Sequence, residues 1–179
     1  MSSLGCQYIL GLGSNLGKKE EYIHKALKAI ELIPKTKLLE VSLAVDSDPV
    51  GYADQPNFLN LCCLIVSEIK APELLTHTLA IESQLGRVRG PEKNGPRCID
   101  IDLLFKEDGP FTSANLTLPH PRWSSRNFVT VPLRHLLQTP SLASNSHWTW
   151  LKQELAQLPD SQDGLRAWNG PTPWSNPTT

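Results

Sequence analysis

The sequence has no long apolar run and no excess of charge of one sign. No segment approaches the roughly 18 consecutive apolar residues of a membrane helix, so we expect no association with a membrane. Lysine and arginine together number 17 against 18 aspartates and glutamates, which gives a formal net charge of -1. A chain without a broad basic surface is not expected to bind nucleic acid. An anionic ligand must therefore be bound by a local cluster of arginines.

Cysteine is scarce, and its spacing does not match the common zinc motifs. The four cysteines are Cys6, Cys62, Cys63 and Cys98, with no Cys-x-x-Cys pair and no histidine-rich spacing. The N-terminus also lacks the charged segment followed by a long apolar one that marks a signal peptide. We therefore predict buried, reduced thiols in a cytoplasmic protein. If Cys62 and Cys63 lie on a strand, their side chains point to opposite faces of it.

What is present is the composition of an ordinary globular domain. The chain has 179 residues, of which 40% are hydrophobic and 20% charged. Its periodicity predicts, in order, a strand, a helix, two strands, a helix and a strand, over residues 7–12, 18–33, 38–45, 58–69, 72–86 and 99–104. This βαββαβ order predicts an α+β fold with a ferredoxin-like core, in which helices flank an antiparallel sheet.

The most informative stretch is residues 95–105, where a Gly-Pro turn and an arginine lead into an apolar run that holds two aspartates. Asp100 and Asp102 alternate with apolar residues, so on a strand their carboxylates project to the same face. Adjacent carboxylates raise each other's pKa unless a cation lies between them, and Mg²⁺ prefers carboxylate and phosphate oxygens. Arg97 can hold a phosphate at the same place. The pattern favours a site for a metal and a polyphosphate; the alternative is a solvated strand edge.

Two other segments carry turn-forming residues beside predicted elements. Residues 11–17 resemble a glycine-rich nucleotide loop, but they lack the third glycine of the dinucleotide fingerprint and the Gly-Lys-Ser/Thr ending of a P-loop. We expect a structural turn there, with Ser14 or Asn15 capping the following helix. Residues 46–56 are too many for a simple hairpin turn, and long loops in compact domains are often functional.

The patterns weaken towards the C-terminus. We expect a third helix around residues 129–137 and a short amphipathic helix over residues 148–158. From Pro159 onward the composition predicts little regular structure.

Several of these motifs together resemble a known enzyme family. Gly95-Pro96-Arg97-x-x-Asp100-x-Asp102-Leu103-Leu104 is similar to the signature of the 6-hydroxymethyl-7,8-dihydropterin pyrophosphokinases, which move a diphosphate from ATP onto a pterin alcohol in folate biosynthesis. Further motifs of this family occur in the same order: Gly13-Ser14-Asn15-Leu16, Asp54-Gln55-Pro56-x-Phe58-Leu59-Asn60, Gly86-Arg87-Val88-Arg89, Leu118-Pro119-His120-Pro121 and Arg126-x-Phe128. The resemblance covers about residues 8–137. We therefore predict a catalytic domain over residues 1–137 and a partly irregular C-terminal extension over residues 138–179.

The resemblance also implies roles for single residues. Asp100 and Asp102 would hold two Mg²⁺ ions that bridge the ATP phosphates, and these two aspartates with Arg87 and Arg97 form the implied catalytic group. The residues implied on the ATP side are Arg89, Leu103, Thr117, His120 and Arg126. Those implied around the pterin are Ser47, Val50, Gly51, Phe58, Asn60 and Phe128, with the two phenylalanines enclosing the ring.

The chain departs from the family pattern at three positions. Phe58 stands where a tyrosine is common, Asn94 where many members carry a tryptophan, and Asn115 where an arginine is frequent near the ATP. One alternative is therefore a relative that binds the ligands without turnover, and another is a ferredoxin-like binding module such as an RNA-recognition domain. An acidic pair on the strand and a net charge near zero argue against RNA. We expect a monomer whose partners are small-molecule substrates, and the sequence identifies no general base.

Overall fold

The structure of the chain, a computed structural model, describes residues 5–88, 90 and 94–174. Within these residues a six-stranded antiparallel sheet has the strand order β5-β1-β4-β3-β8, and β2 also pairs with β4. The strands of this sheet are β1 (Cys6–Ser14), β2 (Thr36–Val41), β3 (Val45–Ser47), β4 (Phe58–Ser67), β5 (Asp100–Lys106) and β8 (Leu165–Ala167). A separate hairpin is formed by β6 (Phe111–Thr112) and β7 (Thr117–Leu118).

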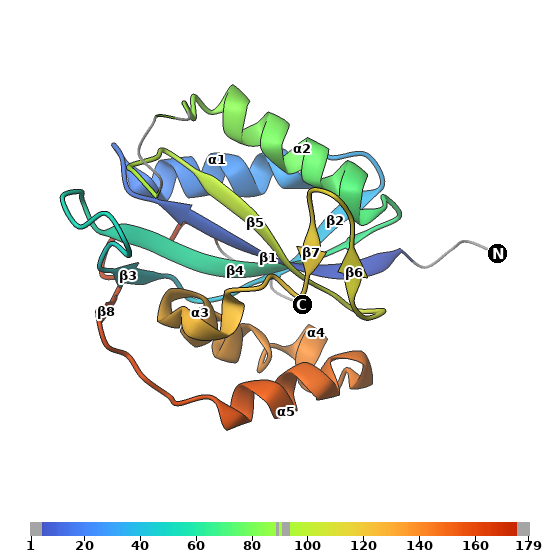
Figure 1. Cartoon of the computed structure of the whole chain (residues 1–179). Helices are drawn as coiled ribbons and strands as arrows, with labels where there is room; N and C mark the ends of the chain where they lie inside the picture. The colour runs from blue at the N-terminus through green and yellow to red at the C-terminus, as the bar shows by residue number, and fades with distance from the viewer. Residues whose placement is uncertain (1–4, 89, 91–93, 175–179) are drawn as a thin grey trace.

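Helices cover both faces of the sheet (Figure 1). The helices α1 (Lys19–Glu31) and α2 (Ala71–Gln84) lie on one face, and α3 (Asn127–Leu136), α4 (Pro140–Ala143) and α5 (Thr149–Gln157) lie on the other. The central strand β4 serves both layers, because its successive side chains alternate between the two faces. Leu61 and Cys63 belong to the apolar core under α1 and α2, whereas Cys62 and Leu64 belong to the core under α3 and α5. The predicted opposite orientation of the two thiols is therefore confirmed.

The predicted ferredoxin-like arrangement is confirmed. The βαββαβ order is present as β1, α1, the β2–β3 segment, β4, α2 and β5, and every strand pair in the sheet is antiparallel. Among the described residues no helix combines the length and the apolar character needed to cross a membrane.

The second predicted strand, over residues 38–45, is divided in two. Strand β2 pairs with the second half of β4, and β3 pairs with its beginning. At the break, Ser42 donates its backbone N–H to the Cys62 carbonyl (2.8 Å), and its hydroxyl accepts the Cys62 N–H (2.9 Å). The Ser42 side chain thus takes over one ladder hydrogen bond and lets the chain bend towards the site described below.

The C-terminal part holds the predicted helix and one short strand that composition does not predict. The expected helix over residues 148–158 is present as α5, and Trp148 before it is fully buried, with its indole N–H 2.9 Å from the Gln7 side-chain carbonyl. The expectation of little regular structure beyond Pro159 is confirmed for the described residues, where the one regular element is the three-residue strand β8, which adds an edge strand to β3. A pairing made to an existing strand edge needs only free backbone groups, so composition does not reveal it. The division into domains at residue 137 stays a prediction.

Candidate active site

Two connected cavities lie at the end of the sheet where β5 begins. The larger has a volume of about 900 Å³ and is bordered by β5, the end of α2, the β6–β7 hairpin and residues 120–126. The smaller has a volume of about 160 Å³ and lies between β3, the start of β4 and the start of α3. Both are lined by the same central residues, namely Asn94, Arg97, Asp100, Asp102, Arg122 and Arg126. A ligand in one cavity therefore borders a ligand in the other.

Strand β5 places the two aspartates between these cavities. Its alternating side chains send Ile101 and Leu103, each 2% exposed, into the core under α1 and α2, so Asp100 and Asp102 face the opposite side. On the neighbouring strand β1 these aspartates are paired with Gly13 and Gly11. Since glycine has no side chain, β1 places none of its own beside the carboxylates; the Asn60 side chain lies over Gly13 and the Leu104 side chain over Gly11.

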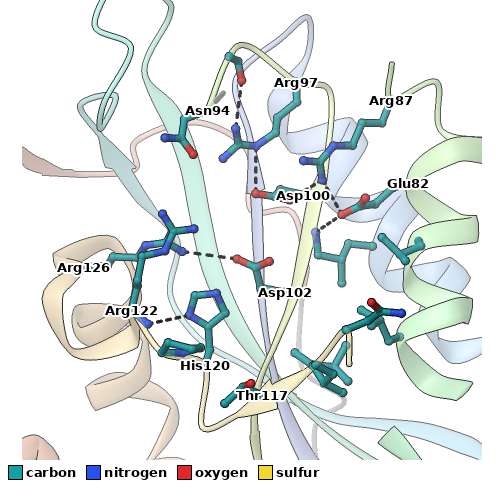
Figure 2. A pocket seen from close by; sticks show the side chains of 18 of the residues that line it. Glu82, Arg87, Asn94, Arg97, Asp100, Asp102, Thr117, His120, Arg122 and Arg126 are labelled. Atoms are coloured by element: carbon teal, nitrogen blue, oxygen red, sulfur yellow. Dashed lines mark hydrogen bonds and ion pairs between the residues drawn. The ribbon is translucent and has the colours of Figure 1, made fainter. Parts of the chain in front are cut away.

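Three arginines surround the carboxylates, as Figure 2 shows. Asp100 forms ion pairs with Arg87 and, at 3.0 Å, with Arg97, which come from the two ends of the segment before β5. Asp102 faces Arg126 on the other side of the cleft, with 3.6 Å between Nη1 and Oδ2. The site therefore holds positive charge on both sides of an acidic pair, which suits an anionic ligand that also carries a cation.

Glu82 at the end of α2 fixes one of these arginines. Its side chain is buried, at 3% exposure, and its Oε1 accepts hydrogen bonds from Arg87 (2.6 Å) and from the backbone N–H of Ile101 (2.8 Å). One carboxylate oxygen thus connects α2, the arginine segment and β5. The role of Glu82 is not apparent from the sequence, because an isolated glutamate on a helix is usually exposed.

The cleft shifts the pKa of Asp102 and of His120, among other side chains that line it. Burial, and then the nearby charge of Asp100, raise the pKa of Asp102 to about 6, although three arginines act in the opposite direction. Burial also lowers the pKa of His120, and the charges of Arg126 and Arg122 act in the same direction. A neutral His120 can accept a hydrogen bond, and its Nδ1 accepts the Arg122 backbone N–H at 3.2 Å. A cation bound beside Asp102 would stabilise its ionised form and lower its pKa.

The smaller cavity has aromatic walls and a carboxamide. Phe58 and Phe128 both line it, and the guanidinium groups of Arg97 and Arg126 lie 4.9 Å and 5.5 Å from their respective ring centres. Asn60 is buried, and its side-chain N–H donates to the Ser47 hydroxyl at 2.8 Å. This combination suits a flat ring with hydrogen-bonding groups at its edge.

Asn15 connects the loops that border the two cavities. Its Oδ1 accepts the Arg97 backbone N–H (2.8 Å), and its Nδ2 donates to the Gln55 side chain and to the Pro56 carbonyl, both at 2.9 Å. Gln55 in turn donates to the Asn94 carbonyl at 2.9 Å. The N-cap residue of α1 is Lys18, so the predicted capping role of Ser14 or Asn15 is wrong. Asn15 holds loops far apart in sequence, a role that its local sequence does not reveal.

A profile of 7,8-dihydro-6-hydroxymethylpterin-pyrophosphokinase (HPPK) matches residues 9–138. The chain belongs to this family. The Bacillus subtilis 2-amino-4-hydroxy-6-hydroxymethyldihydropteridine pyrophosphokinase is 33% identical over 159 residues, which are 89% of this chain and 88% of that protein. The Pseudomonas aeruginosa protein of the same name is 37% identical over 84% of this chain and 90% of its own length.

Some HPPK relatives are much longer than this chain. The Schizosaccharomyces pombe folic acid synthesis protein fol1 is 37% identical over 89% of this chain, but the match spans only 21% of that protein. A crystal structure of an HPPK-DHPS protein in complex with substrates has a TM-score of 0.63 at 10% identity and covers 92% of this chain and 48% of that one. At 10% sequence identity, this structural similarity supports a shared fold and no more.

The structure brings most of the residues implied by the HPPK resemblance to the two cavities. The larger is lined by Arg87, Arg97, Asp100, Asp102, Leu103, Thr117, His120 and Arg126. The smaller is lined by Ser47, Val50, Phe58, Asn60 and Phe128. Arg89 lies outside the described residues. Gly51 is not among the residues that line either cavity in the described chain; it has a φ of 92°, and a Cβ there would lie 3.1 Å from Asn94 Nδ2.

Two of the three departures from the HPPK pattern also border the larger cavity. Asn94 has a φ of 63°, in the left-handed region that asparagine adopts more readily than most residues. Asn115 lines the cleft beside the β6–β7 hairpin. Arg122 lines both cavities as well and was absent from the predicted site, because it lies outside the family motifs quoted above.

Proposed function

We propose that this chain transfers a diphosphate group from ATP to 6-hydroxymethyl-7,8-dihydropterin in folate biosynthesis, giving AMP and the pterin diphosphate. The observation that carries this proposal is the continuity of the two cavities across Asp100 and Asp102. The larger cavity has the arginines for a polyphosphate, and the smaller has the aromatic walls for a pterin. Family membership supports the same reaction.

The two aspartates are the proposed ligands of two Mg²⁺ ions. Among the described residues no group of three or more His, Cys, Asp or Glu side chains forms a metal cage. Two carboxylates in a cleft that also admits phosphate oxygens nevertheless fit Mg²⁺, which usually binds one or two carboxylates together with substrate phosphates. The glycines opposite on β1 add no side chain beside the two carboxylates. When bound, Mg²⁺ would neutralise charge on the phosphates.

The arginines are proposed to hold the diphosphate during transfer. The pterin hydroxyl oxygen forms a bond to the β-phosphorus, the bond from that phosphorus to the oxygen bridging to the α-phosphate breaks, and AMP leaves with that oxygen. Arg87 and Arg97 lie on one side of the aspartates and Arg126 on the other, so they can compensate negative charge throughout. The hydroxyl proton is released to water or to a carboxylate.

Leu103, Thr117 and His120 are proposed to contact the nucleotide, and Arg89, although outside the described residues, is proposed to bind it as well. On the pterin side, Phe58 and Phe128 are proposed to enclose the ring and Asn60 to bind its edge. Ser47, Val50 and Gly51 would supply the loop beside the ring. We further propose a monomeric protein acting in the cytoplasm, with the catalytic residues all lying within residues 1–137.

The test is a turnover assay with ATP, Mg²⁺ and 6-hydroxymethyl-7,8-dihydropterin in which AMP is quantified. We expect AMP to form, and Asp102→Ala to lower the rate by about a thousandfold while the protein stays folded, because the change removes charge from the reaction site. Absence of AMP with a folded wild-type protein would favour the non-catalytic relative. Asp102→Ala activity within a few-fold of wild type would exclude the metal assignment.

The pterin assignment has a separate test. We expect Asn60→Ala to weaken pterin binding by about 10–100-fold, since the loss leaves ring donors or acceptors unpaired at about 1–3 kcal/mol. Calorimetry with a non-hydrolysable ATP analogue is the control and should give near wild-type affinity. An equal loss for both ligands would place Asn60 in the scaffold.

A further inference from the structure

Residues 161–174, here called the C-terminal strap, follow α5 and lie beyond the part of the chain that matches the family. Figure 1 shows the chain running from α5 past α3 to β8, which lies beside β3. Strand β3 carries Ser47, which lines the smaller cavity. The strap is therefore attached to the strand that forms one wall of the proposed pterin site.

Arg166 of the strap binds two aspartates on either side of Ser47. Its Nε donates to Asp46 at 3.0 Å, and its Nη2 donates to Asp48 at 2.6 Å. The backbone N–H of Asp48 also donates to the Gly164 carbonyl at 2.8 Å. Asp48 itself lines the smaller cavity, so the strap fixes a cavity residue through both its side chain and its backbone.

The strap also contacts the opposite wall of the cavity. Asn127, the first residue of α3, donates its side-chain N–H to the Ser161 hydroxyl and the Asp163 carbonyl, each at 3.3 Å. The next residue is Phe128, which lines the cavity. The strap thus connects the β3 wall with the α3 wall.

The far end of the strap is attached to α1 on the other face of the sheet. His24 Nδ1 lies 2.9 Å from the Pro173 carbonyl, and the Lys28 ammonium lies 4.6 Å from the Trp174 ring centre. Lys19 lies 5.4 Å from the Trp168 ring centre and 3.3 Å from Asp46. Contacts with both helical layers limit the movement of the strap.

The charges explain why Arg166 matters more than an isolated surface ion pair. Such a pair contributes little because solvent screens it. Here one guanidinium serves two carboxylates two residues apart, Asp46 in β3 and Asp48 directly after it; Asp46 is only 17% exposed, whereas Asp48 is 56% exposed. Without Arg166 the carboxylates of Asp46 and Asp48 repel each other. Asp46 would still be paired with Lys19, which forms no ion pair with Asp48 in the described part of the chain. The expected result is movement of residues 46–50.

We propose that Arg166 is a positioning residue for the pterin: it does not touch the ring but sets the conformation of residues 46–50 that border it. This inference rests on the proposed function. It assigns a role in substrate binding to the C-terminal strap, through Asp46 and Asp48.

The experiment compares full-length wild type with Arg166→Ala, Arg166→Lys and the control Glu68→Gln. The control breaks another exposed ion pair, Lys35–Glu68 (3.4 Å), at the opposite end of β4. We expect Arg166→Ala to raise the KM for the pterin by about tenfold, because small displacements of binding groups are costly, and to leave the KM for ATP unchanged. Arg166→Lys keeps the charge and should recover part of the loss, whereas the control should match wild type.

Two further measurements keep the proposal falsifiable. In a double-mutant cycle, the effects of Arg166→Ala and Asp48→Asn should be less than additive, because part of the Arg166 effect passes through its contact with Asp48. Hydrogen exchange in residues 46–51 should be faster in Arg166→Ala than in wild type, a result that does not depend on turnover. Equal pterin KM values, equal losses for both substrates, or unchanged exchange would overturn the proposal. A wild-type protein that makes no AMP would instead contradict the proposed function.

Discussion

At the residue scale, Asp102 is held in the free protein with a pKa near 6, above its ordinary value of 3.8. Between these two pH values the folded state binds more protons than the unfolded state, so the stability of the folded state falls as the pH rises through this window. Above pH 6 the ionised Asp102 therefore lowers the stability of the metal-free protein, and below about pH 4 this cost is absent.

We predict that Asp102→Asn raises the melting temperature of the metal-free protein at pH 7.5. The side chain is 39% exposed, so solvent screening reduces the expected gain to about 1 kcal/mol, or about 2–4 °C. The gain should vanish when both proteins are melted near pH 4 in chelator. A variant that melts at a lower temperature than wild type at pH 7.5 would show that the arginines outweigh burial.

The shared orientation of Asp100 and Asp102 could be predicted from the sequence, because strand periodicity is local and residues two positions apart lie on the same face. The role of Glu82 could not, because it depends on where the end of α2 meets β5. Its single oxygen binds both Arg87 and the Ile101 backbone N–H. The sequence pattern of a single helix or strand does not show which residues of another element it will contact.

We predict that Glu82→Ala lowers the free energy of unfolding by about 1–3 kcal/mol, since it removes a buried acceptor from a backbone N–H. Glu82→Gln keeps a carbonyl oxygen at the same position and should cost less. Urea unfolding of both variants is the measurement, with wild type as the reference. Equal losses would show that the negative charge, rather than the acceptor, is what α2 supplies.

At the element scale, β1 reaches the site through residues that have no side chains. Gly13 pairs with Asn60 on one side and with Asp100 on the other. A Cβ at Gly13 would lie 2.7 Å from the Asn60 Oδ1, a distance that real contacts do not show. The glycine is therefore needed for the position of the carboxamide, rather than for an unusual backbone conformation.

Gly13→Ala should for this reason displace Asn60 and weaken pterin binding by at least about tenfold. Titration calorimetry with the pterin, and with an ATP analogue as the control, separates this effect from a general loss of structure. Wild-type affinity for the pterin would mean that Asn60 moves without consequence.

The elements themselves were predicted well where apolar periodicity is strong, as for α1 and β5, or where an apolar run is long, as for β4. The prediction failed at the break between β2 and β3, where the Ser42 side chain replaces a backbone group. It did not include β8, whose Leu165, Arg166 and Ala167 show no buried stripe. In both places the structure depends on a partner strand rather than on local composition.

At the scale of the whole molecule, the central sheet separates two apolar cores that share β4. Cys62 faces one core and Cys63 the other, and burial raises the pKa of both thiols above the ordinary range. Cys6 is less buried, and burial followed by the charge of Asp108 raises the pKa of its thiol to about 11. A thiolate is the reactive form, so all three should react slowly.

We predict that native protein at pH 8 reacts very slowly with Ellman's reagent, with Cys6 the first of these three to react. Unfolding in guanidinium should release all four thiols rapidly. Variants Cys62→Ala and Cys63→Ala identify the groups, and rapid native labelling of either position would contradict the packing of the corresponding core.

The position of Arg97 has a consequence for how the two substrates influence each other. Its guanidinium rests over the Phe58 ring in the smaller cavity while it is paired with Asp100 at the border of the larger one. A polyphosphate that draws Arg97 towards the larger cavity uncovers the aromatic surface on which the pterin would stack. The two binding equilibria are then thermodynamically linked. If bound ATP changes the affinity for the pterin by a given factor, bound pterin changes the affinity for ATP by the same factor.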